Sequence, residues 1–287
     1  MAHTSRAREH DFQTKYAFLN PAYGHNMVDR YDLGHGYEEH LISCVKQSGG
    51  FPPHGLDDLT RRGFEVVTVL DKATSDDLAQ RARQAGDQVD LATLKQEEVR
   101  GVLGAIFSEE LDAKIKFYFQ SHYAVIFFML FQTLPIEDND LLPEEASVSW
   151  GWHCDGGPRR HLKMMVYLNP KDEHDAATEF LDRATTELFN RIGYVFCPLV
   201  HRVSDLSDLA EHYGIDYEPV RISPDAGEAI VFEPAAALHR GAPPTFGARS
   251  VLQLGLIPSP VPWQDFFQKN YQVLVINQGA AFPNLRG

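Results

Sequence analysis

The chain has 287 residues, of which 44% are hydrophobic and 23% charged, so it has enough apolar mass for a sizeable core. It carries 26 Lys and Arg against 40 Asp and Glu, and the net charge of −14 argues against nucleic acid as a partner. Barrels and sandwiches of this length are often undivided, so we expect a single domain over residues 1–287.

Cysteine usage and hydropathy indicate the compartment. Cys44, Cys154 and Cys197 are odd in number and widely spaced, which does not fit a disulfide framework. The first twelve residues lack the basic-then-apolar order of a secretory signal. The most apolar stretch, residues 123–131, has about half the length that a membrane helix requires. We therefore expect a soluble, cytoplasmic protein with no membrane partner.

The N-terminal part of the sequence predicts helices. Residues 1–60 carry aromatic and turn residues without a sustained period, and we interpret them as an arm or lid. A short strand is expected in GFEVVTVL, which begins at Gly63. Three helices should follow, from Ser75 to Gly86, over residues 91–103, and from a cap at Ser108.

Short β-branched and aromatic runs dominate the rest of the chain. Strands are expected at residues 122–131, 147–152, 162–168, 194–200, 218–222, 228–232 and 250–257. Helices first and many short strands afterwards predict a mainly β fold. We expect a β-sandwich or jelly roll with buttressing N-terminal helices, its core and supporting helices covering residues 60–257.

Side chains alternate between the two faces of the strand expected at 162–168. Its even-numbered residues are all apolar, whereas Lys163 and Tyr167 would share the other face with Met165. A lysine and a tyrosine on one face suit either a solvent-exposed face or the polar lining of a ligand cavity.

The segment SWGWHCDGGP contains two candidate metal ligands, His153 and Asp155. They lie two residues apart at the end of an expected strand, so their side chains should share a face while Cys154 points the other way. An imidazole nitrogen beside a carboxylate oxygen can ligate a divalent metal. His239, which follows a strand-like stretch and precedes a Gly/Pro turn, is the candidate for the third ligand.

Arg249 follows His239 by ten residues, at the start of the next expected strand. An arginine there can pair with a carboxylate through two hydrogen bonds, a geometry that lysine does not match. Two histidines and one carboxylate leave three positions open on iron. A 2-oxo acid can take two of them and dioxygen the third. The pattern predicts Fe²⁺, with 2-oxoglutarate and O2 as co-substrates, and no catalytic group beyond the metal centre.

These residues resemble the iron(II)/2-oxoglutarate-dependent dioxygenase superfamily, whose pattern is His-x-Asp, a distant His, and an Arg beyond it at the spacing seen here. The likeness extends to GEAIVFEP before His239 and to HRGAPP leading towards Arg249. The segment RRGFEVVTVLDKATSDDLAQRARQ resembles the N-terminal region of the phytanoyl-CoA dioxygenase-like branch. The resemblance covers residues 60–257 and implies a double-stranded β-helix, a form of jelly roll, with helices packed on one sheet.

The activity that the resemblance implies is oxidation, most simply hydroxylation, of a small organic metabolite, with conversion of 2-oxoglutarate into succinate and carbon dioxide. Asp155 favours hydroxylation over halogenation, because relatives that halogenate have a small residue in place of this carboxylate. One departure from the branch is the segment TEFLDRATTELF, which we expect to be helical after Phe180 instead of forming a proline-glycine-serine-histidine loop.

Four further residues are candidates by position. Lys163 could contact 2-oxoglutarate beside Arg249. Gln132 ends the most apolar strand and could point into the cavity, while Arg159 and Arg160 follow the metal-binding turn and could meet an anionic substrate. For Lys163, Arg159 and Arg160 the alternative is a solvated position without a role in binding.

Two alternatives stay open. Two histidines and a carboxylate also hold catalytic zinc with an open position for water, which would make the chain a mononuclear zinc hydrolase, although Arg249 has no purpose in that scheme. The other alternative is a non-catalytic jelly-roll protein that binds a ligand. The sequence does not fix the substrate, the oligomeric state, or the choice among hydroxylation, desaturation, cyclisation and epoxidation.

Overall fold

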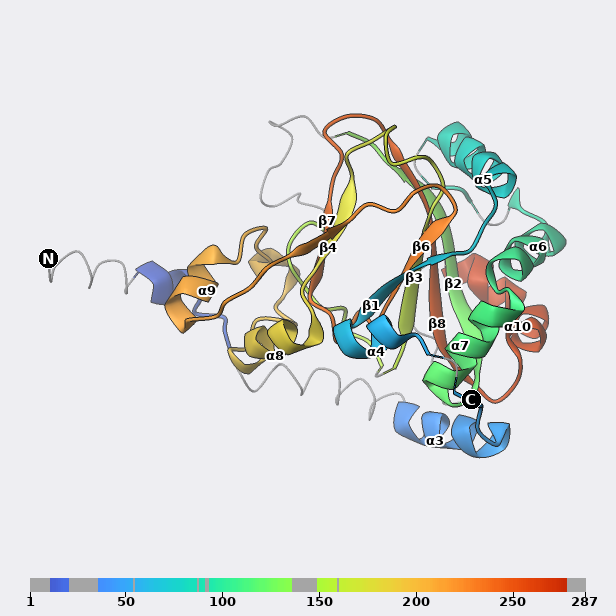
Figure 1. Cartoon of the computed structure of the whole chain (residues 1–287), viewed down its shortest axis with the longest axis horizontal. Coiled ribbons are helices and arrows are strands. Elements are labelled where there is room, and N and C mark those ends of the chain that lie inside the picture. Colours follow the sequence, from blue (N-terminus) through green and yellow to red (C-terminus); the bar gives the residue numbers. More distant parts are fainter. Residues whose placement is uncertain are drawn as a thin grey trace, which may run out of the picture.

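The computed structural model describes residues 11–20, 36–53, 55–86, 88–90, 93–135, 149–158 and 160–277. Two antiparallel sheets face each other, and helices cover the outer side of the larger one (Figure 1). The larger sheet has five strands in the order β1-β6-β3-β8-β2, and the smaller has three in the order β5-β4-β7. The prediction of a mainly β fold with N-terminal helices packed on it is confirmed.

The strands are short except for two long neighbours. In the larger sheet they are β1 (Phe64–Thr68), β6 (Glu228–Phe232), β3 (Leu162–Tyr167), β8 (Arg249–Ser259) and β2 (His122–Thr133). In the smaller sheet they are β5 (Val220–Ile222), β4 (Ala177–Phe180) and β7 (His239–Ala242).

Most of the helices precede β2. They are α3 (Tyr37–Ser48), α4 (Asp57–Arg62), α5 (Lys72–Ala85), α6 (Gln96–Ile106) and α7 (Glu109–Phe119). Later in the chain come α8 (Arg183–Arg191), the 3-10 turn η2 (Leu199–His201), α9 (Ser207–Tyr213) and α10 (Trp263–Asn277). Figure 1 shows α5, α6, α7 and α10 along one side of the larger sheet, with α8 and α9 beyond the smaller sheet. None of the helices in the described residues is long and apolar enough to cross a membrane.

Side-chain caps set the starts of two predicted helices. The carboxylate of Asp71 accepts a hydrogen bond from the backbone N–H of Thr74 at 2.7 Å, so α5 begins before Ser75. Ser75 instead lies buried in the first turn and donates to the carbonyl of Asp71 at 2.9 Å. Ser108 caps α7 as predicted, accepting from the N–H of Leu111.

The two faces of the larger sheet have different partners. Leu162, Met164 and Val166 of β3 have no exposed surface and pack in a core formed with the helices. The opposite face looks towards the smaller sheet, where Phe180 of β4 stacks on Phe64 of β1 with ring centroids 4.6 Å apart. The alternation predicted for β3 is therefore confirmed, and its polar residues face the space between the sheets.

Two predicted strands are not formed. Residues 194–200 make turns that lead into η2, because Gly193 turns the chain at φ 85° and Pro198 has no N–H for a ladder. The side chains of Tyr194, Val195 and Cys197 are instead buried in a loop cluster, whereas Leu199 and Val200 are exposed. Residues 149–152 form a turn, and 147–148 lie outside the described residues. The helix expected after Phe180 is confirmed as α8.

The described parts of the first 60 residues pack on the body of the protein. Tyr16 is 4% exposed in the loop cluster, and Tyr37 of α3 is 1% exposed against β2 and β8. The interpretation of this region as an arm or lid stays a prediction, since residues 21–35 lie outside the described part of the chain.

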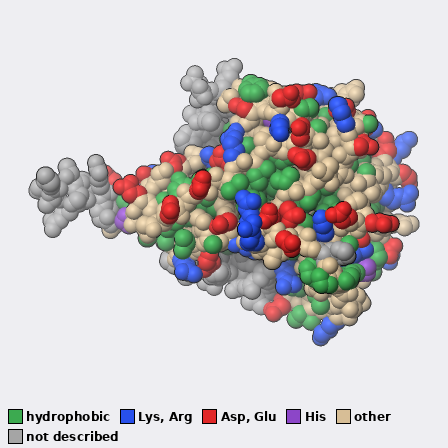
Figure 2. All heavy atoms as spheres, viewed as in Figure 1, with side chains coloured by type: hydrophobic (Ala, Val, Ile, Leu, Met, Phe, Trp, Pro, Cys, Tyr) green, Lys and Arg blue, Asp and Glu red, His purple; other side chains and the backbone are tan. Residues whose placement is uncertain are grey.

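Helix α10 was not foreseen from the sequence. Trp263, Phe267, Tyr271 and Leu274 recur at helical spacing and are buried in the same core as α6 and α7. On the surface, Figure 2 shows acidic and basic side chains interspersed around a hydrophobic area. The net negative charge is thus not gathered into one patch on this face.

Packing between the two long strands generates a stability prediction. A Cβ added to Gly255 of β8 would lie 2.1 Å from Cε1 of Phe127, its partner on β2. Phe127 is buried, so Gly255→Ala should lower the free energy of unfolding by about 1–3 kcal/mol. Gly101→Ala in the exposed part of α6 meets nothing within 4 Å and should raise it by about 0.5–1 kcal/mol. Chemical denaturation of both variants measures the two free energies of unfolding. An unchanged free energy of unfolding in Gly255→Ala would contradict the close packing of Phe127 on Gly255.

Candidate metal centre

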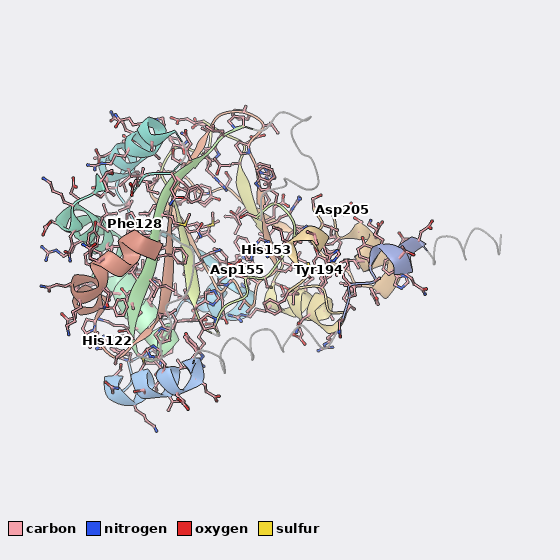
Figure 3. The ribbon with its side chains drawn as sticks, turned by 180° about the vertical axis from the view of Figure 1, so that it is seen from behind. His122, Phe128, His153, Asp155, Tyr194 and Asp205 are labelled. Carbon is pink, nitrogen blue, oxygen red and sulfur yellow. The ribbon has the colours of Figure 1, made fainter. Side chains whose placement is uncertain are left out.

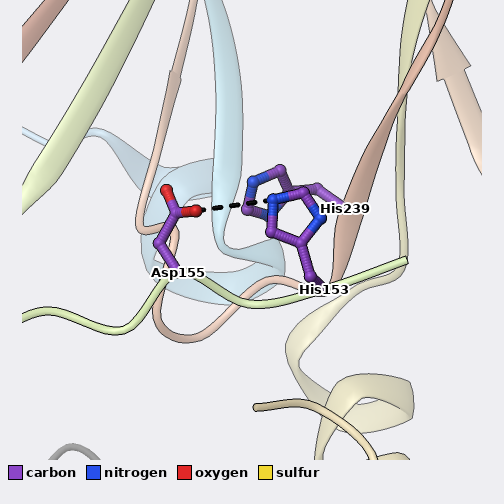
Figure 4. Close-up of side chains that lie close together, drawn as sticks. All are labelled: His153, Asp155 and His239. Atoms are coloured by element: carbon purple, nitrogen blue, oxygen red, sulfur yellow. Dashed lines mark ion pairs between the residues drawn. The ribbon is translucent and has the colours of Figure 1, made fainter. Parts of the chain in front are cut away.

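Three side chains with metal-binding atoms converge between the sheets. The ligand atoms of His153, Asp155 and His239 all lie within 4.8 Å of one another (Figure 4). The Nε2 atom of His153 is 3.4 Å from Oδ1 of Asp155. Both histidines are buried and Asp155 is half-buried. The structure thus brings together the three residues that the sequence nominated from two distant segments.

Backbone hydrogen bonds fix these ligands relative to one another. His153 and His239 form an antiparallel bridge in which the N–H of each donates to the carbonyl of the other at 3.0 Å. His239 is also the first residue of β7, paired with Phe180 of β4. The N–H of Asp155 donates to the carbonyl of Pro234 at 2.8 Å. The segment 153–155 therefore lies beside β7 as a short extension of the smaller sheet.

The other side of this segment is anchored in the loop cluster. The N–H groups of Trp152 and Cys154 donate to the carbonyls of Val203 and Val195, both at 2.8 Å, and the two side chains are buried away from the metal ligands. Tyr194 donates its hydroxyl proton to the carbonyl of Trp152 at 3.0 Å, and Figure 3 shows it close to His153 and Asp155. Cys154 points away as predicted. The supporting role of Tyr194 had no signal in the sequence.

The tautomers of both histidines suit metal binding. Nδ1 of His153 lies 2.7 Å from the carbonyl of Gly151, and Nδ1 of His239 lies 2.9 Å from that of Ala237. A carbonyl only accepts, so each Nδ1 carries the proton and each Nε2 keeps a free lone pair. Burial, and then the neighbouring His153, lower the pKa of His239 to about 3, so this imidazole is neutral near pH 7. Metal-binding histidines are oriented in this way by backbone carbonyls.

Lys163 donates a hydrogen bond to the carboxylate oxygen of Asp155 that does not face His153. Nζ of Lys163 donates to Oδ2 at 2.5 Å, while Oδ1 faces His153. Burial acts to raise the pKa of Asp155, but the positive charge of Lys163 outweighs it and holds the pKa well below its usual range. The carboxylate is thus ionised with one oxygen already engaged. It can offer a metal its other oxygen, which leaves three coordination positions open.

Arg249 is a buried cation that lacks a counter-ion in the described part of the chain. It is 6% exposed, and its hydrogen bonds go to uncharged oxygens: the Tyr167 hydroxyl and Ala177 carbonyl at 3.4 Å and the Thr133 hydroxyl at 3.3 Å. Its Nε is buried and has no partner among the described residues. Burying a charge without an opposite charge costs several kcal/mol, so this position suits an anion. A carboxylate matches the guanidinium with two parallel hydrogen bonds.

The two histidines and Arg249 open onto one cavity of about 150 Å³, which Lys163 also lines. Phe131, Met165 and Phe232 contribute apolar walls. For Tyr167 the sequence left open whether its face of β3 is exposed to solvent or lines a cavity, and it gave no sign of Thr133. Thr133 is brought to Arg249 because the two pair directly in the β2–β8 ladder, a register that depends on the folded sheet.

The remaining candidates do not line this cavity. Phe131 and Thr133 point into it from β2, so Gln132 points to the opposite face and donates to the hydroxyl of Ser250. Arg160 lies on the exposed turn after the ligands and lines a different cavity. Arg159 lies outside the described residues. Gln132 therefore does not point into the metal cavity, whereas the expectation that Arg160 meets an anionic substrate stays a prediction.

No family model matches the chain, and no curated protein sequence matches it. Among solved structures, it is similar to EctD from S. alaskensis with 2-oxoglutarate and 5-hydroxyectoine, at 16% identity over 71% of this chain and 79% of that chain, with a TM-score of 0.47. It is also similar to the non-heme alpha ketoglutarate dependent epimerase SnoN from nogalamycin biosynthesis, at 15% identity over 77% of this chain and 84% of that chain, with a TM-score of 0.44. A Pseudomonas putida prolyl-4-hydroxylase is similar at 14% identity over 76% of this chain and 92% of that chain, with a TM-score of 0.38. Similarity at this level carries no conclusion about activity, which has to come from the site itself.

The contact between Lys163 and Asp155 can be tested through the water bound to a metal. In Lys163→Met both carboxylate oxygens become available to the metal, so one fewer position remains for water. The Mn²⁺-loaded variant should hold two bound waters instead of three, and the water-proton relaxivity should fall by about a third. Met165→Leu, which alters the same face of β3, is the matched control and should leave it unchanged. Equal relaxivity in Lys163→Met and the native protein would rule out this positioning role.

Proposed function

We propose that the chain is a single-domain, non-haem iron(II) oxygenase that uses 2-oxoglutarate to oxidise a small organic metabolite. The observation that carries the proposal is that the metal-binding histidines share one small cavity with a buried arginine that has no counter-ion among the described residues. A metal site alone would not specify a co-substrate. An arginine alone would not specify a metal.

The proposed fold is a double-stranded β-helix with buttressing helices. Two antiparallel sheets enclose the site, one contributing β3 and β8 and the other contributing β7 with the segment 153–155. This arrangement supports the assignment, because both sheets supply residues to the cavity between them. Residues 1–287 would form one domain, with residues 1–60 as its peripheral arm.

Each residue at the site would have a distinct task. His153 and His239 through Nε2, and Asp155 through Oδ1, would hold Fe²⁺. Arg249 would bind the distal carboxylate of 2-oxoglutarate, and one of the free protons of Lys163 can reach the end of the co-substrate that lies at the metal. With iron and O2 bound, decarboxylation of 2-oxoglutarate to succinate and carbon dioxide supplies the electrons that activate dioxygen for oxidation of the substrate.

The protein's own contribution is orientation and exclusion of water. Arg249 at one end of the cavity and the metal ligands at the other would set the direction in which a dicarboxylate binds. The apolar walls formed by Phe131, Met165 and Phe232 keep the medium between these ends poorly polar, which strengthens the ion pair at Arg249. The Thr133 hydroxyl is in place to donate a further hydrogen bond to the same carboxylate.

The metal cavity has room for the co-substrate but not for the metabolite as well. At about 150 Å³ it is smaller than the roughly 300–1,000 Å³ of pockets that take drug-sized ligands. It suits a small dicarboxylate and little else. The metabolite to be oxidised would therefore approach the metal from outside this cavity, on the side opposite Arg249.

Two competing activities fit the site less well. A zinc hydrolase would use the same three ligands and a water molecule, but it would leave the buried charge of Arg249 without a purpose. Halogenation would need a vacant ligand position where Asp155 stands. Hydroxylation or a related oxidation is therefore proposed.

The proposal is tested by turnover of the co-substrate. Protein loaded anaerobically with Fe²⁺ and then exposed to O2 should convert 2-oxoglutarate to succinate. His153→Ala and Asp155→Ala should each lower that rate by more than about 100-fold, beyond the 10–100-fold typical of losing an outer-shell partner. Unchanged succinate formation in these variants would sink the metal assignment. Hydrolytic activity with zinc, and none with iron, would favour the zinc hydrolase.

The assignment of Arg249 is tested with a shortened co-substrate. Arg249→Gln should raise the KM for 2-oxoglutarate by about 30-fold or more, because truncating one partner of a buried charge pair costs about 2 kcal/mol or more. Pyruvate has the same 2-oxo acid group but no distal carboxylate, so its weak turnover should change little in the variant. An equal loss with both acids would show that Arg249 does not bind the distal carboxylate.

A further inference from the structure

A second cavity, of about 480 Å³, lies next to the metal centre. Its walls come from α4, α7, α8 and the turn that follows the metal ligands, and we call it the arginine pocket after Arg160 and Arg183. It meets the metal cavity at consecutive residues, because Phe232 lines the metal cavity and Glu233 lines the arginine pocket. The next residue, Pro234, holds the backbone of Asp155. Residues 232–234 therefore contribute to both sites.

The charges lining the arginine pocket are unbalanced. Oε2 of Glu233 accepts short hydrogen bonds from the hydroxyl of Tyr118 and from Nη2 of Arg183, both at 2.6 Å. Nε of Arg183 is buried and has no partner among the described residues. Two guanidinium groups thus face one carboxylate that already accepts two hydrogen bonds. This leaves one surplus positive charge in a protein whose net charge is −14.

Arg160 is the exposed member of the pair. It forms no hydrogen bond or ion pair with the part of the chain that the structure describes, so its guanidinium is free to bind a ligand. Its backbone has φ 55°, in the left-handed region where glycine or asparagine is more stable than arginine. The turn that carries it is held by buried His161, whose Nδ1 lies 2.5 Å from the carbonyl of Pro158. An arginine kept in a strained position at a cavity suggests a functional reason.

We propose that the arginine pocket binds a carboxylate group of the metabolite that the enzyme oxidises, with Arg160 and Arg183 as its anchors. The surplus of a single positive charge matches a monoanion, and planar guanidinium groups match a carboxylate. Leu56 and Phe117, which also line the pocket, would contact an apolar stem attached to that group. The substrate class is thus a small organic acid with a hydrocarbon part. The inference rests on the proposed function for its meaning, although the binding itself does not require turnover.

Binding can be measured without iron, 2-oxoglutarate or the true substrate. Hexanoate is the probe, with hexanamide as its uncharged counterpart, titrated into the full-length metal-free protein and followed by ligand-observed NMR. Hexanoate should bind and hexanamide should bind at least about 10-fold more weakly, because the amide lacks the charge-assisted hydrogen bonds. Absence of hexanoate binding would overturn the proposal, as would inorganic phosphate binding more tightly than hexanoate.

Variants separate a binding role of Arg160 from a structural one. Arg160→Gln should weaken hexanoate binding by about 10-fold or more, whereas Arg61→Gln, which removes an exposed charge of α4 outside the pocket, should leave it unchanged. Arg160→Gly should also lose binding, yet its melting temperature should not fall, because glycine accepts the left-handed backbone. Retained binding in either Arg160 variant would overturn the assignment.

Proximity to the metal centre gives an independent readout. Mn²⁺ added to the hexanoate complex should broaden the signals of bound hexanoate in the native protein, and the broadening should be absent in His153→Ala. Bound hexanoate that Mn²⁺ does not affect would show that the pocket does not serve the metal centre. If hexanoate binds as expected while the iron-loaded protein forms no succinate, the proposed function fails and the binding site stands.

Discussion

The site depends on the pair of backbone hydrogen bonds between His153 and His239. These bonds add the segment 153–155 beside β7 and bring the two imidazole rings to a centroid separation of 4.5 Å. Strand alternation then sends Trp152 and Cys154 into the apolar loop cluster behind the segment. The positions of the metal ligands are therefore set by a ladder contact on one side and by core packing on the other.

Ligand binding at the two ends of the cavity is coupled through charge. Near pH 7 His239 is an uncharged ligand, Lys163 offsets the charge of Asp155, and Arg249 is left without a counter-ion among the described residues. A divalent metal would add two positive charges to this buried space, and a doubly ionised 2-oxo acid would remove them. Each ligand thus lowers the electrostatic cost of binding the other. A surplus of one positive charge also occurs in the arginine pocket, where Arg160 is exposed to solvent.

The features of the site that the sequence predicts are local ones, whereas the contacts that it does not predict depend on how the strands pair. His153 and Asp155 follow from spacing alone, because alternation fixes their faces wherever an extended segment forms. The partnership of Thr133 with Arg249 arises only from the pairing of β2 with β8, which no local pattern encodes. The apolar run at residues 194–200 resembles a strand in composition, but Tyr194, Val195 and Cys197 are buried by loop packing instead. Short apolar runs carry this ambiguity because burial does not require a ladder.

The most direct test of an iron site that takes 2-oxoglutarate is visible absorption of the anaerobic Fe²⁺ protein during titration with that acid. Chelation of the 2-oxo acid by iron should produce a metal-to-ligand charge-transfer band that saturates at one equivalent per chain. The Zn²⁺-loaded protein should give no band. A protein that binds one Fe²⁺ and shows no band at saturating 2-oxoglutarate would contradict the central claim.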